Sequence, residues 1–335
     1  MRKNVVKAVG GFAAALAVIG LFTWAVGWRD ILVATSRATP SLLAAGVILA
    51  FAGFLAIGVA WWVVVRRVAG YRLRHGLWVF LATQFANSVT PLGQFGGEPF
   101  IAYLLSRDSD IRIEESFGAV LAADIINTIP FFTFSFLGIV IFLFYFPLGG
   151  TVSFLLKAVI GLTVLVAAAF LSVWRYRDTT LRLLEALGTR LASGIDHMEV
   201  DGDSLKERGE GFYTVFEELL AERRTIAVAL AIAHLSSLLS VGALHLLLLS
   251  LGINAPTSAL LFILPASMLA GYLPLPGGLG GIELALAGLL NAVAGVPLPV
   301  ASAAALLYRI STYWLGMMLI GGVAAWNLSI EIFSQ

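Results

Sequence analysis

Long apolar segments alternate with short polar ones along most of the chain. Six of them reach the length of about 20 residues that a helix needs to cross roughly 30 Å of hydrocarbon. They predict full spans at residues 8–27, 41–65, 116–146, 153–174, 225–251 and 300–326. The first segment is too long for a signal-peptide core and lacks a small-residue cleavage site, so we expect a membrane helix there.

Two further apolar segments, 77–105 and 257–294, are each cut in the middle by proline and glycine. Residues 90–98 read Thr-Pro-Leu-Gly-Gln-Phe-Gly-Gly-Glu, and residues 273–283 read Leu-Pro-Leu-Pro-Gly-Gly-Leu-Gly-Gly-Ile-Glu. In both, a glutamate opens a new apolar helix after the glycines. This pattern predicts two broken, re-entrant helix pairs rather than plain spans.

The two interrupted segments belong to a longer internal repeat. Asp124 lies 26 residues after Glu98, and Arg309 lies 26 residues after Glu283. We therefore predict four parts: an N-terminal helix and connection at 1–40, a first repeat at 41–146, a connecting membrane helix with a cytoplasmic amphipathic segment at 147–224, and a second repeat at 225–335.

Composition and charge support an integral membrane protein. Hydrophobic residues make up 59% of the chain and charged residues only 12%, about half the fraction usual in soluble domains. Lys and Arg favour cytoplasmic connections, and their distribution fits only if the two repeats are inverted in the membrane and both termini are cytoplasmic. The expected location is the cell membrane. A net charge of +1 gives no argument for a nucleic-acid partner.

Inverted repeats with broken helices in matching positions are typical of transporters, whose sites lie where the breaks meet. Helix N-termini and glycine backbones suit an anionic head group. Charges inside a span are costly, so Asp124 and Arg309 are functional candidates, expected to pair with each other. Three alternatives stay open: the glycine breaks are packing kinks, the glutamates only cap their helices, and the Asp124–Arg309 pair is purely structural.

Motifs for catalysis are missing from the sequence. It contains no cysteine, no defensible Ser-His-Asp set, no metal-ligand cluster and no nucleotide-binding loop. We therefore expect neither an enzyme nor a cofactor or metal, and ATP cannot drive the protein directly.

Residues 87–98, 273–283 and 308–314 together resemble the lysylphosphatidylglycerol synthase transmembrane region, also called the flippase-like domain family, and the resemblance covers nearly the whole chain. It implies a membrane region that moves charged lipids between leaflets. With the motif residues Asn87 and Tyr308 included, the candidate substrate-binding residues are Asn87, Pro91, Gly93, Gly96, Gly97, Glu98, Asp124, Asn127, Pro276, Gly277, Gly278, Gly280, Gly281, Glu283, Tyr308, Arg309 and Thr312.

The leading hypothesis is a lipid flippase or scramblase for an anionic phospholipid, polyprenyl phosphate or glycolipid. Loop glycines would donate hydrogen bonds to the phosphate, Arg309 would balance its charge, and Glu98 or Glu283 would carry a proton if transport is coupled to a gradient. The alternatives are a small-solute or ion carrier, and a non-catalytic membrane partner of a separate lipid-modifying or glycosyl-transfer enzyme. Small-residue helix faces are also compatible with a homodimer.

Overall fold

A computed structural model describes residues 27–89, 98–109, 111–145, 213–219, 221–272 and 275–317, with single positions at 20, 21, 24, 161, 164, 168, 172, 175, 176, 179 and 211. Every regular element within these residues is helical. In chain order they are α2 (Trp28–Ser36), α3 (Pro40–Ala69), α4 (Leu73–Val89), α5 (Glu98–Ser109), α6 (Ile113–Tyr145), α10 (Arg223–Ser250), α11 (Thr257–Met268), η2 (Leu269–Tyr272), η3 (Pro276–Gly278), α12 (Gly281–Ala294), α13 (Leu298–Arg309) and the π-helix η4 (Ile310–Trp314).

Three of the described helices are long and apolar enough to cross a membrane: α3, α10 and most of α6. They coincide with the spans predicted at 41–65, 225–251 and 116–146, which confirms an all-α membrane protein. The predicted spans at 8–27 and 153–174 lie outside the described residues apart from single positions.

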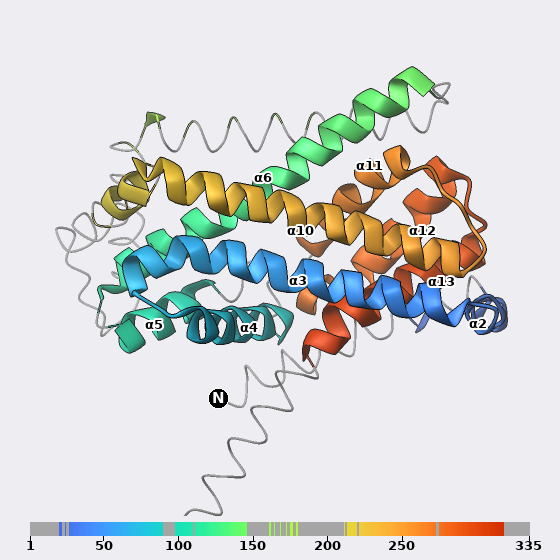
Figure 1. Ribbon diagram of the computed structural model, residues 1–335, viewed down its shortest axis with the longest axis horizontal. Helices are drawn as coiled ribbons and strands as arrows, with labels where there is room; N and C mark the ends of the chain where they lie inside the picture. Colours follow the sequence, from blue (N-terminus) through green and yellow to red (C-terminus); the bar gives the residue numbers. More distant parts are fainter. Residues whose placement is uncertain are drawn as a thin grey trace, which may run out of the picture.

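Helices α3 and α10 pack against each other along most of their length and run in opposite directions (Figure 1). Glycines allow this close approach, because a Cβ on Gly46 would come within 2.9 Å of Leu247 Cδ2 and one on Gly53 within 3.0 Å of Ser240 Oγ. At the end of the pair, the Thr39 N–H donates a 2.8 Å hydrogen bond to the carbonyl of Ser250. The pair forms the spine of the molecule.

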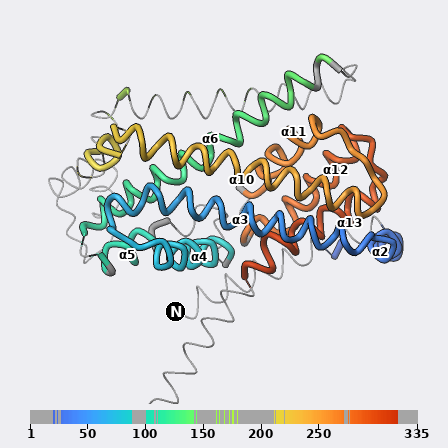
Figure 2. Tube along the Cα trace, in the orientation of Figure 1, coloured from blue at the N-terminus to red at the C-terminus, as the bar shows by residue number. Residues whose placement is uncertain are grey.

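Two hydrophobic clusters lie along this spine. One joins the C-terminal half of α3 to α4, α5 and the start of α6, and includes Trp61, Phe80 and Ile101. The other joins the end of α10 to α11, α12 and α13, and includes Leu247 and Leu260. The short helices consequently occupy opposite ends of the spine, as the trace in Figure 2 shows.

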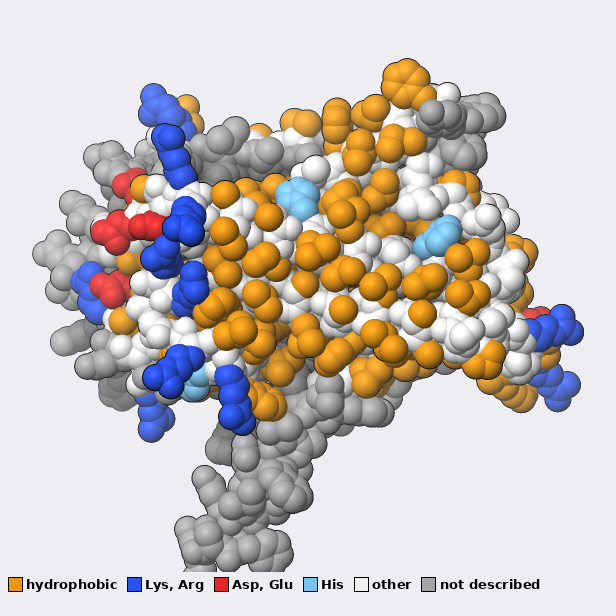
Figure 3. Space-filling view, in the orientation of Figure 1, with side chains coloured by type: hydrophobic (Ala, Val, Ile, Leu, Met, Phe, Trp, Pro, Cys, Tyr) orange, Lys and Arg blue, Asp and Glu red, His pale blue; other side chains and the backbone are white. Residues whose placement is uncertain are grey.

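On the face shown in Figure 3, the charged side chains gather at the two ends of the molecule. Arginines at the end of α3, the starts of α4, α6 and α10, and the end of α5 share one end, where Arg67 pairs with Glu222 at 3.3 Å. Between the ends, the visible face is largely apolar. Exposed apolar side chains of the long helices include Ile48 on α3 and Leu235 on α10. An apolar band between polar ends is the surface that a bilayer requires.

The lengths and positions of the short helices are relevant to the predicted re-entrant segments. Helix α4 begins, and α5 finishes, at the basic end; with 17 and 12 residues they are about 25 and 18 Å long, each too short to cross the hydrocarbon alone. Helices α11 and α12 stand in the same relation to the opposite end. The connection 90–97 lies outside the described residues, so the re-entrant and inverted-repeat assignments stay predictions.

Candidate functional site

The break between α11 and α12 is built around glycines with left-handed backbone. Gly277, Gly278 and Gly280 have φ angles of 56°, 65° and 80°, a conformation that costs other residues free energy. Space is also short, because a Cβ on Gly278 would lie 2.7 Å from the Cα of Gly271, and one on Gly277 would collide with the ring of Tyr313. These positions therefore require glycine for two independent reasons.

Glu283 lies in the first turn of α12, directly after this break. Its Oε2 accepts a 2.7 Å hydrogen bond from the Gly280 N–H, so it caps its own helix, one of the roles that the sequence left open. Its side chain is only 1% exposed. A carboxylate this deeply buried requires a positive partner.

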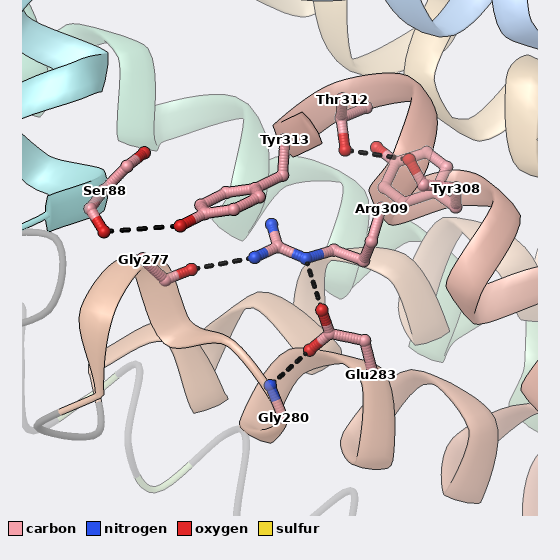
Figure 4. Close-up of polar contacts among 8 residues, drawn as sticks. All are labelled: Ser88, Gly277, Gly280, Glu283, Tyr308, Arg309, Thr312 and Tyr313. Atoms are coloured by element: carbon pink, nitrogen blue, oxygen red, sulfur yellow. Dashed lines mark hydrogen bonds and ion pairs between the residues drawn. The ribbon is translucent and has the colours of Figure 1, made fainter. Parts of the chain in front are cut away.

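Arg309, at the end of α13, is that partner (Figure 4). Its Nε donates to Glu283 Oε1 at 3.0 Å and its Nη2 donates to the carbonyl of Gly277 at 2.8 Å. The sequence had suggested Asp124, on α6, as the carboxylate that holds Arg309. The structure gives Arg309 a different carboxylate, because α12 and α13 pack side by side and bring Glu283 against it.

A π-helix follows Arg309 immediately and forms the other wall of the site. The hydrogen bond that defines its wide turn runs from the Leu315 N–H to the carbonyl of Ile310, five residues earlier. Such wide turns are rare and concentrate at functional sites. Here the turn carries Tyr313, whose ring centroid lies 4.5 Å from the Arg309 guanidinium, a cation–π contact. Within the span predicted at 300–326, which the structure describes as far as residue 317, the helix thus widens right after its charged residue and then continues.

Tyr313 also connects the two halves of the molecule, which are the helices α3 to α6 and the helices from α10 to the π-helix. Its hydroxyl donates to the carbonyl of Ser88, near the end of α4, at 3.3 Å (Figure 4). The residue therefore contacts Arg309, lies against Gly277 and reaches the first half at once.

A cavity of about 170 Å³ opens between the two halves at this point. Residues on α3 and α4 line one side, and residues on the α11–α12 break, α13 and the π-helix line the other. The lining residues are Phe54, Gln84, Phe85, Asn87, Ser88, Met268, Gly277, Tyr308, Arg309, Thr312, Tyr313, Gly316 and Met317. Arg309 brings a formal charge to the wall of this cavity while its counter-ion, Glu283, lies behind it.

Five predicted site residues line the cavity: Asn87, Gly277, Tyr308, Arg309 and Thr312. Glu283, Gly278, Gly280 and Gly281 support the wall from behind and are buried. Asp124 and Asn127 lie on α6 and are not among the lining residues. The buried Oδ1 of Asn127 has no hydrogen-bond partner within the described part of the chain. Pro91, Gly93, Gly96 and Gly97 lie outside the described residues, as do the side chains of Glu98 and Pro276.

Sequence reasoning missed Tyr313, and on the polar face of α4 it included Asn87 but missed Gln84 and Ser88. Two signals were available. Tyr313 follows Arg309 by four residues, which puts both on one helical face, and Gln84, Asn87 and Ser88 follow the same spacing in an otherwise apolar segment. The equal spacing between Glu283 and Arg309 and between Glu98 and Asp124 indicates a repeat. In the second copy, the two residues so spaced, Glu283 and Arg309, are also the ones that pair.

Three apolar helices of membrane length and a polar cavity inside the bundle define the class: this is an all-α membrane protein. Residues 9–320 match the family model of the lysylphosphatidylglycerol synthase TM region, and the chain belongs to this family. Similar relatives include two proteins described as UPF0104 membrane proteins from Methanothermobacter thermautotrophicus. One is 28% identical over 97% of this chain and 94% of its own length, and the other 27% identical over 93% and 94%.

Membership in this family indicates a membrane function related to lipids. It agrees with the resemblance drawn from residues 87–98, 273–283 and 308–314. Within the described residues, no group of three or more His, Asp or Glu side chains could hold a metal ion.

Proposed function

We propose that this protein is a flippase or scramblase that moves lipids with a phosphate-bearing head group between the two leaflets. The observation that carries the proposal is Arg309: a buried guanidinium on the wall of a cavity between the two halves. Charge inside a membrane helix is expensive and is retained where it serves a ligand or a path. Family membership supports a lipid as that ligand.

Arg309 has hydrogen-bonding capacity left for a ligand. A guanidinium carries five N–H donors, and the described contacts of Arg309 use Nε–H for Glu283 and one Nη2–H for Gly277. The remaining donors suit phosphate oxygens, which arginine binds as a fork. In this mechanism the head group enters the cavity and hydrogen-bonds Arg309 while the lipid tails stay in the hydrocarbon.

The architecture supports movement across the membrane rather than binding at one face. We infer that residues 41–146 and 225–326 are inverted copies whose broken helices meet at the cavity. The short helices at opposite ends of the spine and the polar cavity between them support this inference. The basic end would face the cytoplasm, because arginines of the described residues cluster there. The protein would lie in the cell membrane.

The test is leaflet exchange in liposomes that contain the purified protein. Fluorescent phospholipids labelled on an acyl chain are reconstituted, and a membrane-impermeant reductant reports how much label reaches the outer leaflet. Four proteins are compared: wild type, Arg309→Gln, the double variant Arg309→Gln/Glu283→Gln, and Arg67→Gln at the basic end.

The double variant keeps a neutral hydrogen-bonding pair in place of the ion pair, so it separates loss of charge from loss of folding. We expect exchange by wild type and by Arg67→Gln, and none by either variant that lacks Arg309. Undiminished exchange by the folded double variant would contradict the proposal. If the wild type exchanges no lipid, the solute-carrier and enzyme-partner alternatives gain instead.

A further inference from the structure

We infer that the cavity selects phosphodiester head groups, which carry one phosphate charge, over phosphomonoesters, which carry up to two. This deepens the proposed function and rests on it. The inference starts from the charges that surround the cavity and from the hydrogen-bond donors of the residues that line it.

The positive charge at the cavity is already matched. Arg309 and Glu283 lie 3.0 Å apart and both side chains are buried, so the pair is neutral as a whole. The other polar side chains in the lining are neutral: Gln84, Asn87, Ser88, Tyr308, Thr312 and Tyr313. In the sequence, the remaining Lys and Arg residues fall in the connections or near the ends of predicted spans. An anionic ligand in this cavity therefore finds one positive charge, that of Arg309, which is already shared with Glu283.

Among the described residues that line the cavity, no second cation offsets a second negative charge on the ligand. The N-terminus of α12 offers the equivalent of about half a positive charge, but Glu283 already occupies its first turn. Away from water, the repulsion between Glu283 and an added anion is weakly screened and grows with the ligand's charge. One phosphate charge can be stabilised by the free edge of Arg309, whereas two would leave the site strongly negative.

The donors fit the same ligand. Once Nε–H binds Glu283 and one Nη2–H binds Gly277, three N–H groups of Arg309 remain. A phosphodiester offers two non-bridging oxygens, which the guanidinium can bind as a fork. The volume of about 170 Å³ is below the roughly 300 Å³ of pockets for drug-sized molecules. It holds a head group, not the tails.

The decisive experiment changes the charge of one lipid by pH. Wild-type protein is reconstituted with acyl-labelled phosphatidylglycerol, a phosphodiester, or with acyl-labelled phosphatidic acid. Phosphatidic acid is a phosphomonoester and, like phosphorylated side chains, loses a second proton as the pH rises. Exchange of each lipid is measured at pH 5 and pH 8, beside protein-free liposomes. At pH 8 we expect phosphatidylglycerol to exchange at least about tenfold faster, and at pH 5, where phosphatidic acid is a monoanion, we expect the two rates to converge.

A variant then tests the charge argument itself. Glu283→Gln keeps an oxygen for the Gly280 N–H but removes the negative charge beside Arg309. We expect it to raise the rate for phosphatidic acid relative to phosphatidylglycerol at pH 8 by at least about tenfold, because it removes one unit-charge repulsion where screening by water is weak. Glu222→Gln removes the same charge at the exposed end of α10 and is the matched control, expected to leave the ratio unchanged.

The outcomes separate the two claims. Equal exchange of both lipids by the wild type at pH 8 overturns the selectivity and leaves the flippase proposal standing. Exchange of neither lipid at either pH overturns the proposed function and the selectivity with it. An unchanged ratio in folded Glu283→Gln shows that Glu283 does not set the preference, and overturns the charge argument.

Discussion

Two arginine–glutamate pairs in this protein have similar lengths and opposite surroundings. Arg309–Glu283 spans 3.0 Å with side chains 8% and 1% exposed, whereas Arg67–Glu222 spans 3.3 Å with side chains 43% and 50% exposed. The first lies in the bundle beside a cavity, and the second lies where α3 ends and α10 begins, at the basic end of the molecule. Distance alone therefore does not distinguish them.

What distinguishes them is whether a side chain that loses its partner can be solvated by water instead. An exposed charge that loses its partner regains water, so surface pairs contribute about 0–1 kcal/mol. A buried charge that loses its partner has no such compensation, and breaking a buried pair costs about 3–5 kcal/mol. Burying the pair is itself costly, which is why a site of this kind indicates use rather than stabilisation.

The largest effect is expected from Glu283→Ala, which removes both the partner of Arg309 and the acceptor for the Gly280 N–H. We expect a loss of about 3–5 kcal/mol in the free energy of unfolding. Denaturation in detergent, followed by tryptophan fluorescence, measures it. The control is Glu222→Ala at the exposed pair, and an equal loss in both variants would refute the distinction between the two pairs.

A smaller loss, about 1–3 kcal/mol, is expected from Gly277→Ala, because the added Cβ meets the Tyr313 ring and the φ of 56° is strained for alanine. Gly252→Ala is the matched control, since Gly252 has a φ of 81° but open space around it. The same denaturation assay should show the larger loss at Gly277. Equal losses would mean that Tyr313 gives way without cost and that backbone strain accounts for both.

Tyr313→Phe removes the hydrogen bond to the Ser88 carbonyl but keeps the ring over Arg309. We expect it to destabilise the protein by about 0.5–1.5 kcal/mol, the contribution of a typical hydrogen bond. Comparison with Tyr313→Leu, which also removes the ring, separates the link between the halves from the cation–π contact. If Phe and Leu behave alike, the ring contributes nothing beyond its hydroxyl.

The smallest effect is expected from Glu222→Gln, at most about 1 kcal/mol. Its effect should also shrink as salt is raised from low ionic strength to 1 M, because exposed charges are screened over a few ångströms at that concentration. The buried pair should keep its contribution across the same range. Salt-dependent loss at Arg309–Glu283 would place that pair in contact with bulk solvent.

Much of the fold could be predicted from the pattern of apolar segments. The three long spans at 41–65, 116–146 and 225–251 agree with α3, α6 and α10 to within a few residues, since a helix that faces hydrocarbon must be apolar along its whole length. The break at 273–280 could also be predicted, because glycine and proline end helices through their own backbone conformations, whatever surrounds them. Family membership followed from motifs that the sequence carries openly.

The choice of partner for Arg309 could not be predicted in the same way. The internal repeat in the sequence suggested Asp124 as the partner of Arg309. In the structure, the packing of α12 against α13 brings Glu283 to Arg309. The contacts of Tyr313 likewise could not be predicted. They depend on the π-helix, which holds the ring against Arg309, and on the approach of α4, which supplies the Ser88 carbonyl.

The sequence by itself determined that this chain belongs in a bilayer, where its helices lie, and which residues are too costly to bury without use. Those properties follow from transfer free energies and local backbone preferences, which each segment carries alone. Only the tertiary structure decided which charges meet and that they flank a cavity between the two halves. The physical reason is that an ion pair and a cavity are set by the distances between helices far apart in sequence, and those distances come from packing.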